Sequence, residues 1–211
     1  MHAGALQKSA QAALAILSKS DILRRAYIAG GTALALQLGH RESYDFDFYT
    51  PQDIRAEDVV SHLATLGKFT TTLLEPPHTI LGVFKGVKFS LFRYTYPLIK
   101  VPKHFLGVAI ASLDDVACMK LSAICGRATK RDYVDIYTIT KQIAPIEKQL
   151  GWYEKKFGPL GNNLYVIIKA LGYFEDAEGD EMPRMLTPLT WDEVKTFLTA
   201  ESIRLGKKVF R

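Results

Sequence analysis

The spacing of apolar residues changes near the middle of this 211-residue chain. Up to about residue 111, short apolar runs and alternating apolar and polar positions predominate, which is typical of strands joined by a few helices. From Ser112 onward, apolar residues recur every three or four positions, which is typical of helices. We therefore predict an α+β fold with two domains. Residues 1–111 would form a mixed or antiparallel sheet with helices, and residues 112–211 a C-terminal helical bundle.

The first half is predicted to alternate between strands and helices. Thr32 is a suitable N-cap for the short second helix, and Gly39 is expected to end it. Lys85 and Gly86 separate two strands of an antiparallel meander, and Pro51 ends an earlier strand. The predicted helices cover residues 6–23, 33–38 and 56–66, and the predicted strands cover residues 26–29, 44–49, 69–74, 79–84, 87–94 and 105–111.

The second half is predicted to contain five helices. Ser112 with Asp115, and Thr190 with Glu193, have the spacing of a capping box, in which each side chain bonds the other residue's backbone N–H. Thr129 is a suitable N-cap for the second of these helices. The predicted helices cover residues 112–125, 129–143, 145–158 and 163–174, with the last beginning after residue 190, and an acidic connection covers residues 175–184.

Composition and charge are those of an ordinary globular protein, with 48% apolar and 23% charged residues. The net charge of +5 is a mild indication of an anionic partner such as a nucleotide or nucleic acid. If Cys118 and Cys125 lie on one helix, their Cα atoms are roughly 10 Å apart, too far for a disulfide, which favours a reducing compartment. No apolar run approaches the roughly 20 residues of a membrane span. We expect a cytoplasmic protein without a membrane segment.

Two carboxylates, Asp45 and Asp47, are the first candidates for chemistry. Side chains at positions i and i+2 of a strand point to the same face, so both carboxylates converge on one place. Two like charges this close repel unless a cation lies between them. Hard oxygen ligands of this kind suit Mg²⁺, which keeps several waters and shares substrate phosphates. The alternative is an exposed edge strand with two solvated aspartates.

A glycine-containing turn precedes these carboxylates. Gly30, Gly31 and Thr32 join a strand to a helix, which leaves backbone N–H groups and the helix N-terminus available to bind phosphate oxygens. Arg41 and Ser43 add a cation and a hydroxyl just ahead of the aspartates. The alternative is an ordinary tight turn. The five histidines lack the spacing of zinc ligands, and the chain contains no P-loop or dinucleotide-binding glycine pattern.

The segment 30–48, GGTALALQLGHRESYDFDF, resembles the first motif of the AbiEii/AbiGii-toxin type nucleotidyltransferases, a branch of the polymerase-β-like nucleotidyltransferase superfamily. The family pattern is Gly-Gly-Thr, a short apolar helix, and then His-Arg-x-Ser-x-Asp-x-Asp-Phe. The positions that match it are Gly30, Gly31, Thr32, His40, Arg41, Ser43, Asp45, Asp47 and Phe48.

A second block, residues 119–137, contains four cations and two carboxylates around a helix junction: Lys120, Arg127, Lys130, Arg131, Asp132 and Asp135. From the residues alone, a salt-bridged helix surface is the favoured interpretation. The family carries a Lys on one helix and an Arg-x-x-Lys-x-Asp-x-x-Asp run on the next, and this block fits that pattern. The resemblance implies that Lys120 contacts nucleotide phosphates and that Asp132 belongs to the catalytic group.

The resemblance as a whole implies a polymerase-β-like fold and an Mg²⁺-dependent transfer of a nucleotidyl group from an NTP to an acceptor. It implies catalytic roles for Asp45, Asp47, Lys120 and Asp132, metal binding by Asp45 and Asp47, and nucleotide binding by Gly30, Gly31, Thr32, Arg41, Ser43, Arg127 and Lys130, with Asp135 and Arg131 as additional candidates. It also implies a toxin of a bacterial toxin–antitoxin or phage-defence pair, an RNA or tRNA acceptor, and an AbiEi-type antitoxin regulator as partner.

Two other functions stay open at this point. The acceptor could be a small-molecule or protein hydroxyl, or the chain could be a nucleotide- or RNA-binding module with weakened catalysis. Polymerase-β-like enzymes commonly use a third carboxylate on a later strand, where this chain offers Ser90. Asp132 or Asp135 could replace that carboxylate, a single metal could be bound firmly, or the site could be inactive.

Overall fold

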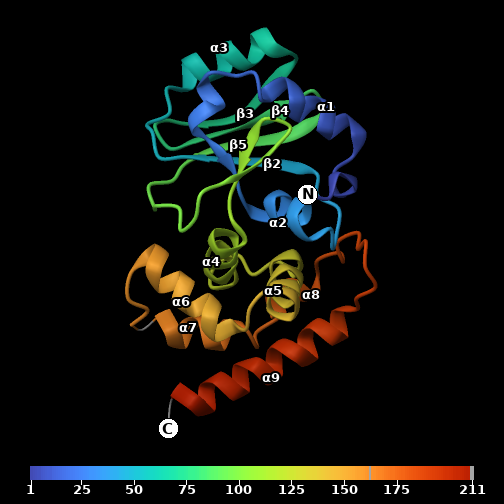
Figure 1. Ribbon diagram of the computed structural model, residues 1–211, viewed down its shortest axis with the longest axis vertical. Coiled ribbons are helices and arrows are strands. Elements are labelled where there is room, and N and C mark those ends of the chain that lie inside the picture. The colour runs from blue at the N-terminus through green and yellow to red at the C-terminus, as the bar shows by residue number, and fades with distance from the viewer. Residues whose placement is uncertain (162, 210–211) are drawn as a thin grey trace. The chain divides into compact units, whose positions relative to one another are not determined.

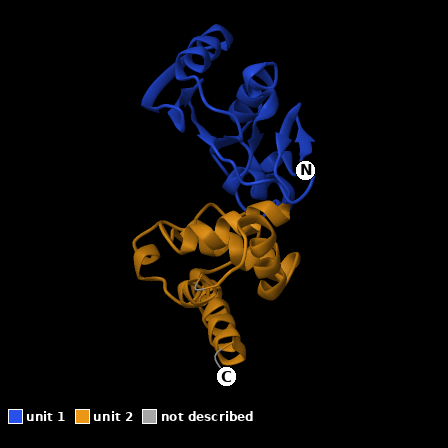
Figure 2. Ribbon diagram, turned by 90° about the vertical axis from the view of Figure 1, so that its left-hand side faces the viewer, with its two compact units in different colours: residues 1–112 blue, residues 113–211 orange. Residues whose placement is uncertain are grey.

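The fold was described from a computed structural model, which describes residues 1–161 and 163–209 in two compact units (Figure 1). Figure 2 shows unit 1, Met1–Ser112, in blue and unit 2, Leu113–Arg211, in orange. The division lies one residue from the expected domain boundary. Residues 162, 210 and 211 of the expected helical domain lie outside the described part of the chain.

Unit 1 contains a seven-stranded sheet with three α-helices and two short 3-10 turns. The helical elements are η1 (Ala3–Ala5), α1 (Lys8–Leu17), η2 (Ile22–Arg25), α2 (Gly30–Leu38) and α3 (Ala56–Leu66). The strands are β1 (Tyr27–Ile28), β2 (Asp45–Thr50), β3 (Phe69–Glu75), β4 (Thr79–Phe84), β5 (Val87–Arg93), β6 (Lys103–Phe105) and β7 (Val108–Ile110).

The sheet is mixed, as predicted, and its strand order is β3-β4-β5-β2-β1-β7-β6. Strands β3, β4 and β5 form the antiparallel meander, and β5 then pairs with β2 in parallel. The short strand β1 is antiparallel to β2 and parallel to β7. β2 therefore lies at the centre of the sheet, where its backbone is paired on both sides.

The two faces of the sheet differ in character because β2 alternates between buried and half-buried positions. Phe46 and Phe48 are fully buried on one face, together with Phe89 of β5. Helices α1 and α3 lie over this face, while α2 lies on the other side of β2 (Figure 1). Apolar burial on one face is the main stabilising term for such a layered unit, and it leaves the other face of β2 available for polar side chains.

Unit 2 is entirely helical in its described residues. Its helices are α4 (Leu113–Ile124), α5 (Lys130–Gln142), α6 (Ile146–Phe157), α7 (Asn163–Ala170), α8 (Glu175–Glu178) and α9 (Trp191–Val209). Tyr133 of α5 is fully buried at the centre of the apolar core, where its ring contacts Phe174 and Trp191 at centroid distances of 5.0 and 6.0 Å. Lys156 of α6 and Asp115 of α4 form a fully buried ion pair of 2.7 Å.

Several predicted boundaries were wrong for identifiable physical reasons. Helix α2 begins at Gly30, so Thr32 lies within its first turn and does not cap it. The single strand predicted at 105–111 is a hairpin of β6 and β7, because Leu106 and Gly107 form a turn with φ of 48° and 83°. Two positive φ values are those of a type I′ turn, which Leu rarely occupies. Lys85 and Gly86 adopt the same turn, with φ of 48° and 84°.

Three further differences concern helices. The helix predicted at 6–23 is replaced by the shorter helix α1, Lys8–Leu17, and the 3-10 turn η2, Ile22–Arg25. The fourth helix of the second half ends at Ala170, where the Tyr133 hydroxyl donates a hydrogen bond of 3.2 Å to the Ala170 carbonyl. The acidic connection at 175–184 contains the short helix α8. Among the described helices, none has the length and apolar character needed to cross a membrane.

Candidate active site

The carboxylates of Asp45 and Asp47 lie on the same face of β2. Both side chains are half-buried, whereas the intervening Phe46 is fully buried on the opposite face. This arrangement follows from the two-residue period of a strand. Because β2 is paired on both sides, its backbone holds the two carboxylates in a fixed relation. The predicted convergence of Asp45 and Asp47 on one place is therefore consistent with the observed strand.

The beginning of α2 lies against Asp47. Gly30 has a φ of +62°, and a Cβ atom built there would come 3.5 Å from Asp47 Oδ2. The backbone N–H of Ala29 donates a hydrogen bond of 3.1 Å to the Asp47 carbonyl, which fixes the helix start beside β2. The first turn of an α-helix carries unsatisfied N–H groups and a partial positive charge. An anion held by those groups would lie next to the carboxylates.

Thr32 and Ser43 connect α2 to the chain that leads into β2. Their hydroxyl oxygens lie 2.7 Å apart, and the Thr32 hydroxyl also donates to the Asp45 carbonyl at 2.5 Å. Both residues are buried, with 2% and 7% of their surface exposed. These contacts position α2 against Asp45. The two hydroxyl residues of the motif therefore hold the site together through these hydrogen bonds.

Arg41 lies across the first turn of α2. A Cβ atom built at Gly31 would come 2.5 Å from Arg41 Nη2, so only glycine leaves room for the guanidinium in this position. Arg41 is 3% exposed, and its Nη1 donates a hydrogen bond of 3.0 Å to the Glu42 carbonyl. The structure thus places a buried cation beside the first turn of α2. A buried guanidinium and a helix N-terminus together favour a phosphate.

The neighbouring strand β5 supplies the residues opposite the carboxylates. In the parallel pairing of β2 with β5, Asp47 is opposite Ser90 and Asp45 is opposite Lys88. Ser90 therefore occupies the place next to Asp47 on the same face, and this place carries no acid. Sequence reasoning did not identify Lys88. The alternation of β5 places it on the same face as Ser90, and that alternation was the available signal.

In this site, the protein ligands available to Mg²⁺ would be the carboxylates of Asp45 and Asp47. In residues 1–161 and 163–209, no group of three or more His, Cys, Asp and Glu residues could hold a metal ion. Asp45 and Asp47 alone form a two-carboxylate set on one rigid strand. Mg²⁺ is commonly bound by one or two carboxylates together with water and substrate phosphates. The two carboxylates and the adjacent phosphate-binding turn suit this mode of binding.

The second block forms a buried ion-pair network within unit 2. Lys120 Nζ of α4 lies 2.7 Å from Asp132 Oδ1 and 2.6 Å from Asp135 Oδ2, both on α5. The side chains of the two aspartates are 0% exposed and that of Lys120 is 4% exposed. Asp132 also accepts hydrogen bonds from Arg127 and Thr129. The network joins α4 to the beginning of α5.

The charge of this network sets the protonation of its central acid. Burial alone raises the pKa of Asp132, but the nearby Lys120 ammonium and the bonds from Arg127 and Lys120 outweigh it and lower the pKa to about 2. Asp132 is therefore ionised throughout the neutral range. A buried charge needs such compensation because its desolvation is costly. The guanidinium of Arg127 is different, since 67% of its side chain is exposed.

The other two cations of the block lie differently. Lys130 is buried, and its Nζ donates hydrogen bonds of 2.6 and 3.3 Å to the carbonyls of Asp180 and Glu178. Its ammonium also lies 5.1 Å from the ring centroid of Trp191. Lys130 therefore fixes the connection between α8 and α9. Arg131 is exposed.

The predicted site residues thus fall into two groups, each within one unit. Unit 1 brings together Gly30, Gly31, Thr32, Arg41, Ser43, Asp45 and Asp47, and unit 2 brings together Lys120, Arg127, Asp132 and Asp135. The hydroxyls in unit 1 and the ion pairs in unit 2 hold helices and strands in place. The groups in unit 1 that could contact a ligand are the two carboxylates, the first turn of α2 and Arg41.

Comparison with known proteins identifies one curated relative and several solved structures. No known protein-family model matches the chain. The chain is 35% identical over 202 residues to the uncharacterised protein aq_aa25 of Aquifex aeolicus strain VF5. The aligned region covers 91% of this chain and 93% of that protein. This relative's name carries no function.

The structural similarities concern a set of nucleotidyltransferase-related chains. One is MenT4, a nucleotidyltransferase toxin from Mycobacterium tuberculosis H37Rv, with a TM-score of 0.59 and 15% identity over 92% of this chain and 82% of that chain. Another is JHP933 from Helicobacter pylori, with a TM-score of 0.55 and 16% identity over 96% of this chain and 90% of that chain. At such identities the similarity shows the fold, and a fold alone does not establish an activity.

These findings confirm the fold that the Gly30–Phe48 motif implied. The α+β architecture, the mixed sheet and the following helices agree with the solved chains across more than nine-tenths of this chain. The chain belongs to the same protein family as the Aquifex aeolicus protein, and its fold is similar to that of the nucleotidyltransferase toxin MenT4 and of JHP933.

Proposed function

We propose that this protein is a nucleotidyltransferase that moves a nucleotidyl group from an NTP to a hydroxyl of an acceptor, with release of pyrophosphate. The observation that carries the proposal is the position of Asp45 and Asp47 beside the first turn of α2, where Asp47 Oδ2 lies 3.5 Å from the Cβ position of Gly30. Two carboxylates next to a phosphate-binding helix start are the parts that a metal–NTP complex requires. The nucleotidyltransferase fold supports the same activity.

Each group of the site has a definite role in this proposal. The N–H groups of the first turn of α2 bind the phosphates, and Arg41 neutralises part of their charge. Asp45 and Asp47 would hold Mg²⁺, and the bound ion would supply positive charge to stabilise the phosphates in the transition state. Thr32 and Ser43 keep α2 and β2 in register, so that phosphates and carboxylates stay adjacent. Positioning of this kind supplies most of the catalysis in phosphoryl and nucleotidyl transfer.

The carboxylates of unit 2 bear on the number of metals. Asp132 and Asp135 share the Lys120 ammonium within a fully buried network. This favours a site in which Asp45 and Asp47 are the only carboxylate ligands and one metal is bound firmly. The same contacts favour Lys120 and Asp132 as positioning residues, whereas the family resemblance implies direct roles in phosphate contact and catalysis. The exposed guanidinium of Arg127 remains the group of this block best suited to contact a nucleotide.

For the acceptor we favour RNA, and for the biological role a toxin of a toxin–antitoxin or phage-defence pair in the cytoplasm. The support is the AbiEii/AbiGii-type motif, the net charge of +5, and the similarity to a nucleotidyltransferase toxin. An AbiEi-type antitoxin regulator is the partner that this role implies. A small-molecule or protein hydroxyl is the alternative acceptor, and the position of the transferred label distinguishes the two.

One observation favours a second candidate, a nucleotide- or RNA-binding module with weakened catalysis. Ser90 lies opposite Asp47 on β5. Polymerase-β-like enzymes commonly carry a third carboxylate on a later strand of this kind. A neutral hydroxyl is a poor ligand for a second Mg²⁺. This candidate predicts NTP binding in calorimetry without any turnover.

The activity is tested by incubating the protein with Mg²⁺, total RNA and each NTP labelled at the α-phosphate. We expect label in RNA with the unaltered protein and its loss in the double variant Asp45→Asn with Asp47→Asn. The matched control is Asp58→Asn on α3, an exposed aspartate with 56% side-chain exposure. Transfer that survives the double variant would refute the proposed roles of the carboxylates. Absence of transfer under every condition would refute the activity.

A further inference from the structure

A row of aromatic rings continues the face of the sheet that carries the two carboxylates. We define this aromatic row as Tyr49, Phe92, Tyr94 and Tyr96. Tyr49 follows Asp47 by two positions on β2, so it lies on the same face, and Phe92 is its partner on β5. With a rise of about 3.3 Å per residue, the row lies roughly 7 Å along the strand from Asp47. None of the roles proposed above uses these residues.

The rings form one continuous chain of contacts that runs from buried to exposed. Tyr49 packs against Phe92 and Tyr94 with centroid distances of 5.4 and 5.3 Å. Tyr94 in turn packs against Tyr96 at 5.2 Å. Tyr49, Phe92 and Tyr94 are half-buried, whereas Tyr96 is 48% exposed. The buried end is anchored by Tyr27 of β1, which is 5% exposed and stacks on Tyr49 at 6.0 Å.

Contacts of this kind hold an exposed ring in a fixed orientation. Most exposed side chains must lose rotamer freedom when they bind, whereas a ring already packed on its neighbour loses less. The backbone is fixed as well, because the Tyr94 N–H donates a hydrogen bond of 2.7 Å to the Thr50 carbonyl and so extends the pairing of β5 with β2. The aromatic row is therefore a preorganised flat surface next to the proposed site.

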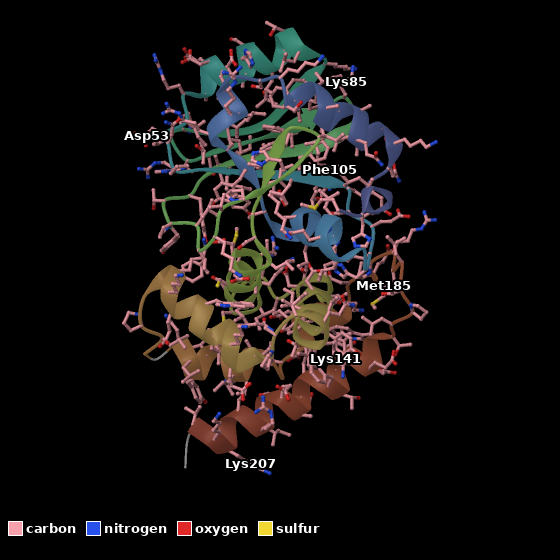
Figure 3. All side chains as sticks on the ribbon, viewed as in Figure 1. Asp53, Lys85, Phe105, Lys141, Met185 and Lys207 are labelled. Carbon is pink, nitrogen blue, oxygen red and sulfur yellow. The ribbon has the colours of Figure 1, made fainter. Side chains whose placement is uncertain are left out.

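The charges around the row favour a polyanion. Lys100 is exposed in the segment that follows Tyr96, and Lys88 lies on the same face four positions before Phe92, roughly 13 Å along β5. Arg93, which follows Phe92 on β5, is paired at 2.6 Å with Asp53, which is labelled in Figure 3. Aromatic rings with basic residues along the same face suit a single-stranded nucleic acid, since bases stack on the rings and the cations attract the phosphates.

The order of groups along β2 indicates which nucleotide would stack there. The first turn of α2 begins beside Asp47, where a Cβ atom at Gly30 would come 3.5 Å from Asp47 Oδ2, and continues to Thr32, which bonds the Asp45 carbonyl. The aromatic row lies beyond Asp47, toward the end of β2. The rings thus lie on the side of Asp47 that is away from Asp45 and from the Thr32 contact. In-line transfer places the attacking hydroxyl of the acceptor and the leaving pyrophosphate on opposite sides of the reacting phosphorus.

We propose that the aromatic row binds an unpaired nucleobase of the acceptor RNA and so directs its hydroxyl toward Asp45 and Asp47. The proposal rests on the proposed function in one respect, namely that the acceptor is RNA. A nucleobase of the incoming NTP would offer the same stacking chemistry, and the experiment below separates the two sources.

The test uses the full-length protein and a short, fluorescently labelled oligoadenylate, with binding followed by anisotropy in the absence of NTP and metal. Tyr96→Leu is expected to weaken binding about tenfold, the order of effect of losing one base–aromatic stack. Tyr96→Phe retains the ring and should bind within about twofold of the unaltered protein. The matched control is Tyr165→Leu on α7, because Tyr165 is 55% exposed. A duplex of the same length should be insensitive to Tyr96→Leu, since its bases are already stacked.

A second readout assigns the source of the base. In the transfer assay, Tyr96→Leu should raise the KM for RNA and leave the KM for NTP unchanged. A raised KM for NTP with unchanged oligoadenylate affinity would overturn the proposal and assign the rings to the NTP base. Equal binding by Tyr96→Leu and the unaltered protein, or no measurable binding by either, would also overturn it. Because anisotropy requires no transfer, a failure of the catalytic proposal would leave this binding result intact and distinguishable.

Discussion

Replacement of Lys120 by methionine is expected to destabilise the helical unit strongly. Lys120 Nζ lies 2.7 Å from Asp132 Oδ1 and 2.6 Å from Asp135 Oδ2, and neither aspartate side chain is exposed. Methionine fills a similar volume but carries no charge. The substitution therefore removes the cation that two buried carboxylates share, while it leaves the packing nearly unchanged.

The size of the effect follows from the cost of a buried charge that loses its partner. Breaking a buried ion pair by removing one member costs about 3–5 kcal/mol. Asp132 retains its bonds from Arg127 and Thr129, which compensates part of its charge. We therefore expect a loss of about 3 kcal/mol in the free energy of unfolding. Domains are stable by only about 5–15 kcal/mol, so this loss is a large fraction of the total.

The assay is urea denaturation of both proteins followed by circular dichroism. The matched control is Lys155→Met on α6, an exposed lysine that should change the free energy of unfolding by less than about 0.5 kcal/mol. A loss below about 1 kcal/mol for Lys120→Met would refute the positioning role argued from the ion pairs. If that variant were stable but inactive, the direct phosphate contact implied by the family resemblance would be the better account of Lys120.

Three further predictions concern single residues. The pKa of Asp132 is lowered from 3.8 to about 2 in the folded protein, so its contribution to stability is present above about pH 4 and disappears as the pH falls toward 2. Urea midpoints measured over this range should fall with pH. In Asp132→Asn, the urea midpoint should depend less on pH over the same range. Gly31→Ala should displace the Arg41 guanidinium and raise the KM for NTP, with a change of less than about 1 kcal/mol in the free energy of unfolding; an unchanged KM would contradict the proposed phosphate contact. Thr190→Ala removes the capping box with Glu193 and should cost about 1 kcal/mol, measured by urea denaturation, whereas no loss would show that the cap does not stabilise α9.

Local patterns predicted much of the fold because the corresponding interactions are local. The helix α3 has the predicted bounds, since its apolar face and its terminal Gly67 are visible in the sequence. The capping box at Thr190 and Glu193 is present, with a hydrogen bond of 2.7 Å from the Thr190 N–H to Glu193. The turn at Leu106 was missed because its conformation is unusual for leucine, and only the pairing of β6 with β7 imposes it.

The candidate site was predicted less completely, because its geometry depends on contacts between distant residues. The two-residue spacing of Asp45 and Asp47 predicted their common face. The register that sets Ser90 opposite Asp47 results from pairing across 43 positions of sequence, which no local pattern fixes. The sequence indicated ion pairs on a helix surface for this block, but not that Lys120 is buried between two aspartates, because a lysine and an aspartate twelve positions apart meet only after α4 packs on α5.

A further contrast concerns residues that the motif and the structure place differently. Thr32 and Ser43 match a nucleotide-binding motif, yet their hydroxyls bond each other and the backbone of Asp45. A sequence motif contains residues that keep the site folded as well as residues that contact the ligand. The hydrogen bonds of the Thr32 and Ser43 hydroxyls assign these residues to the framework, and such bonds become known only from the folded chain.

The account is tested most directly by comparing two labelled forms of the same NTP. The protein is incubated with Mg²⁺, RNA and an NTP labelled either at the α-phosphate or at the γ-phosphate. Nucleotidyl transfer predicts that the α-label enters the RNA, and that the γ-label leaves with pyrophosphate and never enters it. Entry of the γ-label would show phosphoryl transfer, and absence of the α-label would show no transfer at all. Either result would contradict the proposed use of Asp45, Asp47 and the first turn of α2.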